Sequence, residues 1–195
     1  MSVGFRAVQW NRDKLIYDAI LLAVVAAFIV SFIAIEAHLH PPKDGPAWID
    51  LRIRAFGLCA FLMLTAILSI GPLARLSPRF LPLLYNRRHF GVLTFVIAAL
   101  HASFMVEWYA VQNTLPNIVT ELTTWTDYGR FIGFPFKALG LGTLLILLLL
   151  ASTSHDYWLQ FLSPPVWKAL HMLVYGPYDL AVMRLSLGAV QNNHH

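Results

Sequence analysis

Two histidines lie inside long apolar stretches of this 195-residue chain: His101 in GVLTFVIAALHASFMVEWY and His171 in WKALHMLVYGPYDLAVMRLSLG. An ionisable side chain within a membrane segment is costly, so it indicates a function. A neutral imidazole can ligate a haem iron with one nitrogen while the other makes a hydrogen bond. It can also make a polar contact that stabilises helix packing. The residues alone leave both interpretations open.

The second stretch also contains Asp179 and Arg184. At about 1.5 Å per helical residue, His101 and Asp179 reach a similar depth of roughly 20 Å, and Glu107 and Arg184 both reach roughly 28 Å. This predicts a haem-free ladder of two polar pairs, Asp179 with His101 and Glu107 with Arg184. A mixed arrangement is equally open, in which Asp179 orients a ligating His101 or Arg184 binds a haem propionate. A transporter or proton channel needs a broken helix at mid-membrane, for which Gly176-Pro177 is the cue.

The elements that position these residues follow from the composition. Hydrophobic residues make up 58% of the chain and charged residues 12%, whereas charged residues are about a quarter of a soluble domain. Continuous Leu- and Ala-rich runs of about 20 residues are typical of transmembrane helices and not of barrel strands. The sequence predicts an all-α integral membrane protein, one domain over 1–195, with five spans near 15–37, 52–74, 89–111, 134–152 and 166–188.

The charges predict the orientation and exclude some partners. The net charge of +4 comes from basic residues in short clusters between the apolar runs, as expected for cytoplasmic loops and not for a nucleic-acid surface. We therefore expect a cytoplasmic N-terminus, a periplasmic C-terminus, lipid as the surrounding partner and no nucleic acid. The single cysteine, Cys59, excludes disulfides and cysteine-ligated clusters within this chain.

Two segments resemble a known family. GPLARLSPRFLPLLYNRRHFGVLTFVIAALH is similar to the second and third helices of ferric-reductase-like transmembrane domains, and LGLGTLLILLLLASTSHDYWLQFLSPPVWKALHMLVY is similar to the next two. The resemblance covers roughly residues 52–190. It implies a bundle of six helices that holds haem b, usually two, and passes electrons across the membrane. In the bacterial branch, such domains are often linked to Rieske-type or reductase partners. With five spans, the chain as given is expected to be one helix short of the family.

The resemblance also assigns site residues. His101 matches the third-helix haem ligand of the family, and His171 matches its first fifth-helix ligand. The family's second fifth-helix histidine falls at Arg184, its inner third-helix ligand at Arg87, and a second-helix histidine of the iron–sulfur-linked branch at Thr65. Both haem sites implied by the family therefore lack a ligand here.

Two smaller features complete the prediction. His89 is close to the missing inner position, but twelve residues turn a helix by about 120° from His101, so His89 is a poor substitute. Glu36, Arg52 and Arg54 are predicted to form an ion-pair cluster at the outer interface.

Two functions follow. The first is a haem b transmembrane electron-transfer subunit of a redox complex in the bacterial inner membrane. It would work with other membrane or peripheral redox subunits and would not be a self-contained enzyme, because the chain has no flavin, nicotinamide or iron–sulfur motif. The alternative is a degenerate, haem-free structural or accessory subunit of a larger membrane complex. His101 and His171 favour the first function, and Arg184 favours the second.

Overall fold

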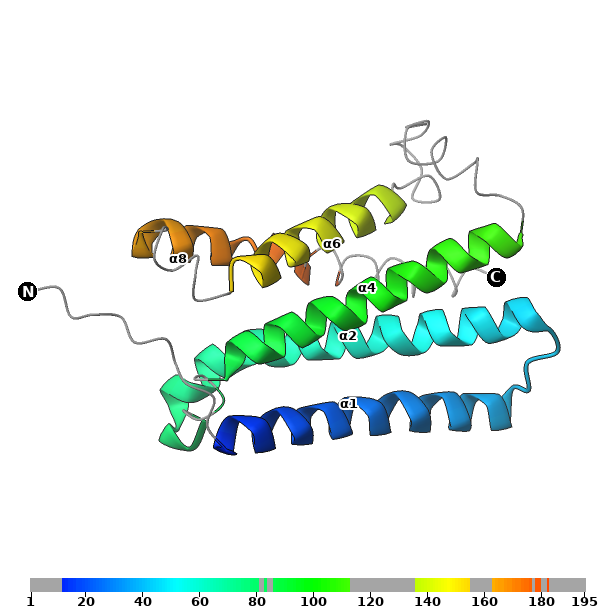
Figure 1. The fold of residues 1–195 in the computed structure, drawn as a ribbon, viewed down its shortest axis with the longest axis horizontal. Coiled ribbons are helices and arrows are strands. Elements are labelled where there is room, and N and C mark those ends of the chain that lie inside the picture. The colour runs from blue at the N-terminus through cyan, green and yellow to red at the C-terminus, as the bar shows by residue number, and fades with distance from the viewer. Residues whose placement is uncertain are drawn as a thin grey trace, which may run out of the picture.

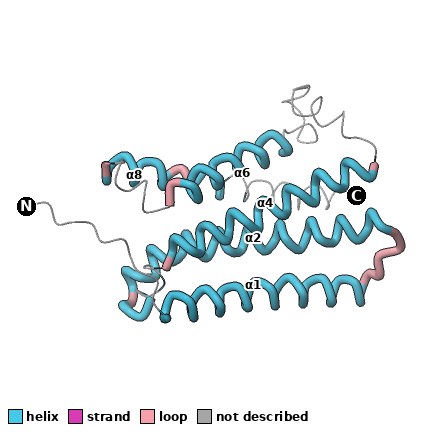
Figure 2. Tube along the Cα trace, in the orientation of Figure 1, coloured by secondary structure: helices cyan, strands magenta, loops and turns pink. Residues whose placement is uncertain are grey.

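The described residues form helices joined by short turns, with no strand among them (Figures 1 and 2). The computed structural model describes residues 12–80, 83, 86–112, 136–154, 163–176, 178, 179 and 182. The predicted all-α class is confirmed. The elements are α1 (Arg12–Leu39), α2 (Gly45–Leu76), the short 3-10 helix η1 (Pro78–Phe80), α4 (Arg87–Val111), α6 (Phe136–Ser152) and α8 (Pro164–Met172).

Helices α1, α2, α4 and α6 follow the first four predicted spans. Of these, α1, α2 and α4 are long and apolar enough to cross a membrane. Helix α2 begins at Gly45, earlier than the predicted residue 52. The reason is local, because an Asp44 side-chain oxygen accepts a hydrogen bond of 2.8 Å from the backbone N–H of Ala47. Pro46, in the first turn of the same helix, has no backbone N–H and therefore needs no acceptor there.

The fifth span differs from the prediction of one uninterrupted helix over 166–188. Helix α8 ends at Met172, and the N–H of Gly176 donates to the carbonyl of Leu173 at 3.1 Å, a turn tighter than the α-helix. In an α-helix the Leu173 carbonyl would accept from position 177, but this residue is proline and has no N–H. Residues 175, 176, 178, 179 and 182 are helical again, and the N–H of Tyr178 donates to the Val174 carbonyl at 3.4 Å. The fifth span is therefore interrupted at Leu173 and Val174, next to the Gly-Pro pair, and is not one continuous helix.

Helices α1, α2 and α4 lie side by side in alternating directions, and α6 and α8 lie on the side of α4 away from α1 (Figure 1). Two apolar clusters hold this arrangement, and α2 contributes to both. The α1-side cluster joins α1, α2 and α4 through Val25, Cys59, Met63 and Ile97. The α6-side cluster joins α2, α6 and the segment after α8 through Leu64, Leu147, Leu150 and Val174.

The outer face of α1 is apolar. Large side chains such as Leu22, Val24 and Val30 are more than half exposed. An apolar face of this size on a long helix is what lipid chains cover in a bilayer. The chain is therefore a membrane protein whose helices face lipid on the outside and pack through the two clusters on the inside.

Candidate functional site: the His101 seat between α2 and α4

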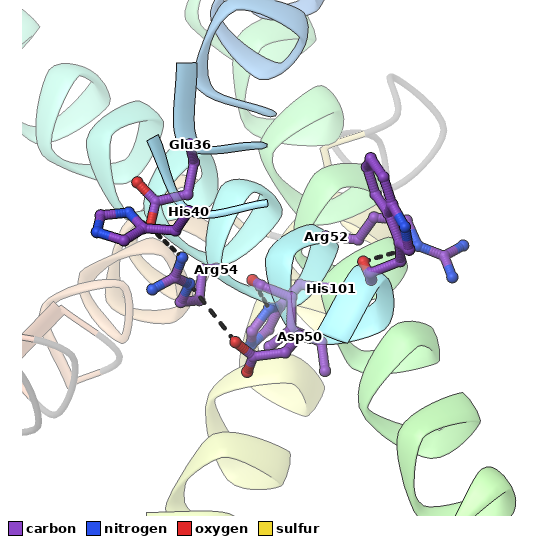
Figure 3. A network of polar contacts seen from close by, with 8 residues as sticks. Glu36, His40, Asp50, Arg52, Arg54 and His101 are labelled. Atoms are coloured by element: carbon purple, nitrogen blue, oxygen red, sulfur yellow. Dashed lines mark hydrogen bonds and ion pairs between the residues drawn. The ribbon is translucent and has the colours of Figure 1, made fainter. Parts of the chain in front are cut away.

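His101 lies in α4 and is half-buried against α2. Its Nδ1 is 2.9 Å from the backbone carbonyl oxygen of Ile53 (Figure 3). A carbonyl oxygen can only accept, so Nδ1 carries the proton and donates it. In a neutral imidazole the lone pair is then on Nε2, which is the nitrogen able to ligate a metal.

The ring of His101 lies directly on Gly57 of α2. A Cβ atom built on Gly57 would be 2.9 Å from Cε1 and 3.0 Å from Nδ1 of the imidazole. Atoms at such distances clash, so the ring occupies the space that a side chain at position 57 would need. The sequence analysis did not single out Gly57, because a lone glycine in a helix carries no sign of what packs against it.

His171 is half-buried in the last turn of α8. Its neighbour Leu170 packs against the α6-side cluster. Further along, the ring of Tyr178 stacks on the ring of Phe61 in α2, with centroids 6.0 Å apart and planes 2° from parallel. The contact of the His101 ring with Gly57 and the Ile53 carbonyl is the His101 seat. Since Phe61 is one helical turn from Gly57, the segment that follows His171 packs on α2 next to this seat.

The predicted polar ladder is only partly tested. Asp179 is exposed, and the hydrogen bond of His101 Nδ1 goes to Ile53. The pairing of Asp179 with His101 stays a prediction. Arg184 lies outside the described residues, and Glu107 makes an ion pair of 3.2 Å with Arg52 of α2.

The end of α1 and the start of α2 carry an ion-pair cluster (Figure 3). Arg54 pairs with Glu36 of α1 and lies 3.6 Å from Asp50, one turn earlier in α2. The Nδ1 of His40 lies 3.5 Å from a carboxylate oxygen of Glu36. The Glu36–Arg54 part of the predicted cluster is confirmed, whereas Arg52 turns to α4. Within the described ranges, no group of three or more His, Cys, Asp or Glu side chains could hold a metal ion.

A contact between a histidine of α4 and an aspartate of α1 joins these two helices at the opposite end of the bundle, near the start of each. The Nδ1 of His89 is 2.7 Å from a carboxylate oxygen of Asp18. This contact was missed, although an acid within an apolar run is a signal that could have indicated it. Of the other positions named from the family, Arg87 begins α4, and the Thr65 hydroxyl donates to the Phe61 carbonyl of its own helix at 2.9 Å.

Comparisons with known proteins agree with this architecture. Residues 47–182 match the family described as "Ferric reductase like transmembrane component". The chain is also 30% identical over 168 residues, covering 84% of this chain and 71% of the relative, to the protein-methionine-sulfoxide reductase heme-binding subunit MsrQ of Caulobacter vibrioides. No solved structure gives a significant match. The matched region runs from the start of α2 to beyond α8 and includes both histidines, so the chain belongs to the family of ferric-reductase-like transmembrane components.

Proposed function

We propose that this protein is a haem b-binding transmembrane subunit that passes electrons to or from a separate redox subunit in the bacterial inner membrane. The observation that carries the proposal is the state of His101. Its Nδ1 donates to the Ile53 carbonyl, so the lone pair of the neutral ring is on Nε2. A hydrogen bond from the second nitrogen of a metal-ligating histidine is the usual arrangement at haem and metal sites.

The residues present fit haem b at the level of the donor set. His101 and His171 are half-buried histidines on helices of one bundle, and neutral imidazole is a usual haem ligand. His101 and His171 would hold the iron. Bound haem b would carry single electrons by cycling its iron between the ferric and ferrous states. The protein's own residues bind and orient the group, and the apolar clusters on both faces of α2 exclude water from the bundle.

A separate partner is supported by what the chain contains and by its relative. No flavin, nicotinamide or iron–sulfur motif occurs in the sequence. The Caulobacter vibrioides relative is named as the heme-binding subunit of a protein-methionine-sulfoxide reductase. We infer that the electron partner of this chain is likewise a separate reductase subunit, docked at one end of the helix bundle.

Absorption spectra of the purified protein, oxidised and dithionite-reduced, test the proposal. We expect a reduced α-band at the position of b-type haem in the wild type. His171→Ala and His101→Ala should each lose most of this band. His40→Ala is the matched control, because His40 is exposed on the loop after α1, and this variant should keep the band.

The alternative function, a haem-free structural or accessory subunit, is favoured by arginine at position 184, where the family has a histidine. The same spectra distinguish the two. A wild type purified from haem-replete cells without any reduced α-band supports the accessory subunit and contradicts the electron-transfer proposal. Full haem retention in His171→Ala would show instead that the ligand set is wrong.

A further inference from the structure

The contact between His101 and Gly57 involves a specific stretch of α2 backbone. Ile53 and Gly57 are four residues apart, so in the helical register the Ile53 carbonyl accepts from the N–H of Gly57. The same carbonyl accepts from His101 Nδ1 at 2.9 Å, which its two lone pairs permit. A side chain at position 57 would occupy the space beside this carbonyl that the imidazole now fills.

Other glycines of the long helices have no such role. A Cβ atom built on Gly91 of α4 meets no atom of the described residues within 4 Å, apart from its chain neighbours and its own helix backbone. At this position alanine is sterically free, whereas Gly71 of α2 precedes Pro72, whose ring would meet a Cβ at position 71. The close approach is therefore specific to Gly57 and to the ring that lies on it.

We infer that Gly57 is a positioning residue for His101. The missing side chain lets the imidazole reach the Ile53 carbonyl, and this hydrogen bond fixes both the ring position and the tautomer that leaves Nε2 for the iron. The inference rests on the proposed function for its redox consequence. The seat itself is a property of the protein without the haem.

The consequence for a bound haem has a defined sign. Donation from Nδ1–H to a carbonyl makes Nε2 a more basic ligand, and a more basic ligand stabilises ferric over ferrous iron. In Gly57→Ala the ring must shift, because it is the movable end of a side chain and the helix backbone is not. The hydrogen bond is then lengthened or lost. We expect haem affinity to fall by about tenfold and the midpoint potential of the remaining haem to become more positive.

Gly91→Ala, on the helix that carries His101, is the matched control and should keep the wild-type haem content and midpoint potential. Equal haem content and equal potential in Gly57→Ala and Gly91→Ala would overturn the inference. A more negative potential in Gly57→Ala would overturn it as well, because loss of the hydrogen bond predicts the opposite sign.

A haem-independent experiment separates this inference from the proposed function. In protein freed of haem and labelled with ¹⁵N-histidine, the nitrogen chemical shifts of His101 report its tautomer, with assignment by the signal missing in His101→Gln. We expect the Nδ1–H tautomer in the wild type and in Gly91→Ala, and its loss in Gly57→Ala. A wild-type protein without haem would contradict the proposed function alone, whereas an Nε2–H tautomer in the wild type would contradict the seat.

Thermal unfolding covers the case in which Gly57→Ala does not fold. Among the described residues outside its own stretch of helix, the atoms nearest to the added methyl group are those of the His101 imidazole, so Gly57→Ala should lower Tm in the wild-type background but not in His101→Ala. Recovery of folded protein in the double variant supports the seat. If the double variant is as unstable as Gly57→Ala, position 57 is constrained by something other than His101, and the inference is wrong.

Discussion

Asp18 of α1 and His89 of α4 form a contact in which both side chains can ionise, at 2.7 Å. Both side chains are partly shielded, with 24% of Asp18 and 39% of His89 exposed. Helices α1 and α4 also meet through apolar side chains of the α1-side cluster. A polar pair has a defined geometry, so at this place it restricts the sliding of α1 along α4 that apolar contacts alone would allow.

Removing this pair should loosen α1. We expect Asp18→Asn to destabilise the protein by about 1 kcal/mol, and to cost much less in a His89→Gln background. Thermal unfolding of the two single variants and the double variant in detergent measures this coupling. Asp13→Asn is the control, because Asp13 is exposed in the first turn of α1. Additive effects of Asp18→Asn and His89→Gln would show that the contact has no net energy.

At the scale of elements, α2 and α4 form the pair that positions the site. His101 reaches back to the α2 backbone, and further along the same interface, toward the end of α4, Arg52 of α2 pairs with Glu107 of α4. The Arg52 guanidinium carbon also lies 5.0 Å from the ring centroid of Phe104. The two polar contacts are almost two helical turns apart along α4, so together they fix the register of α4 on α2.

The Arg52–Glu107 contact predicts a specific coupling. In double-mutant cycles of thermal stability, Glu107→Gln should couple with Arg52→Gln by about 0.5 kcal/mol. It should not couple with Arg54→Gln, because the neighbouring arginine pairs with Glu36 and Asp50. No coupling with Arg52→Gln would contradict the contact. The same cycle with Arg184→Gln tests the pairing predicted from helix depth, which a coupling of similar size would support.

At the scale of the whole molecule, the two ends of the bundle differ in charge. Acidic and basic groups are mixed at the end that holds the α1–α2 turn and the end of α4 (Figure 1). The other end holds the start of α1, the end of α2 and the start of α4. Its basic residues are Arg12, Lys14, Arg75, Arg79, Arg87 and Arg88. This asymmetry predicts that the basic end faces the cytoplasm.

Cysteine labelling tests this orientation. In a Cys59→Ala background, Lys43→Cys on the α1–α2 turn should react with a membrane-impermeant maleimide in cells whose outer membrane has been permeabilised. Arg79→Cys in η1 should react only after the inner membrane is disrupted. Both native side chains are exposed, so the two sites differ in the side of the membrane they face and not in burial. The reverse labelling pattern would invert the proposed topology.

The sequence by itself determined the helices, the membrane class and the family. These follow from the length of the apolar runs and from local motifs. Such local signals do not depend on what the helices pack against. It also determined His101 and His171 as the residues to consider. The interruption of the fifth span after α8 was within reach, because Pro177 removes a backbone donor from the helix wherever it lies.

Only the tertiary structure decided which partners the ionisable groups take. Depth along a helix predicted Asp179 for His101 and Arg184 for Glu107, but depth gives no information about the direction in which a side chain points around the helix. The structure adds two contacts that depth does not give, His101 with a backbone carbonyl of α2 and Glu107 with Arg52. The pairings of Asp179 with His101 and of Arg184 with Glu107 stay predictions. The role of Gly57 was out of reach for the same reason: a backbone acceptor and an absent side chain leave no signature in the sequence until a second helix packs against them.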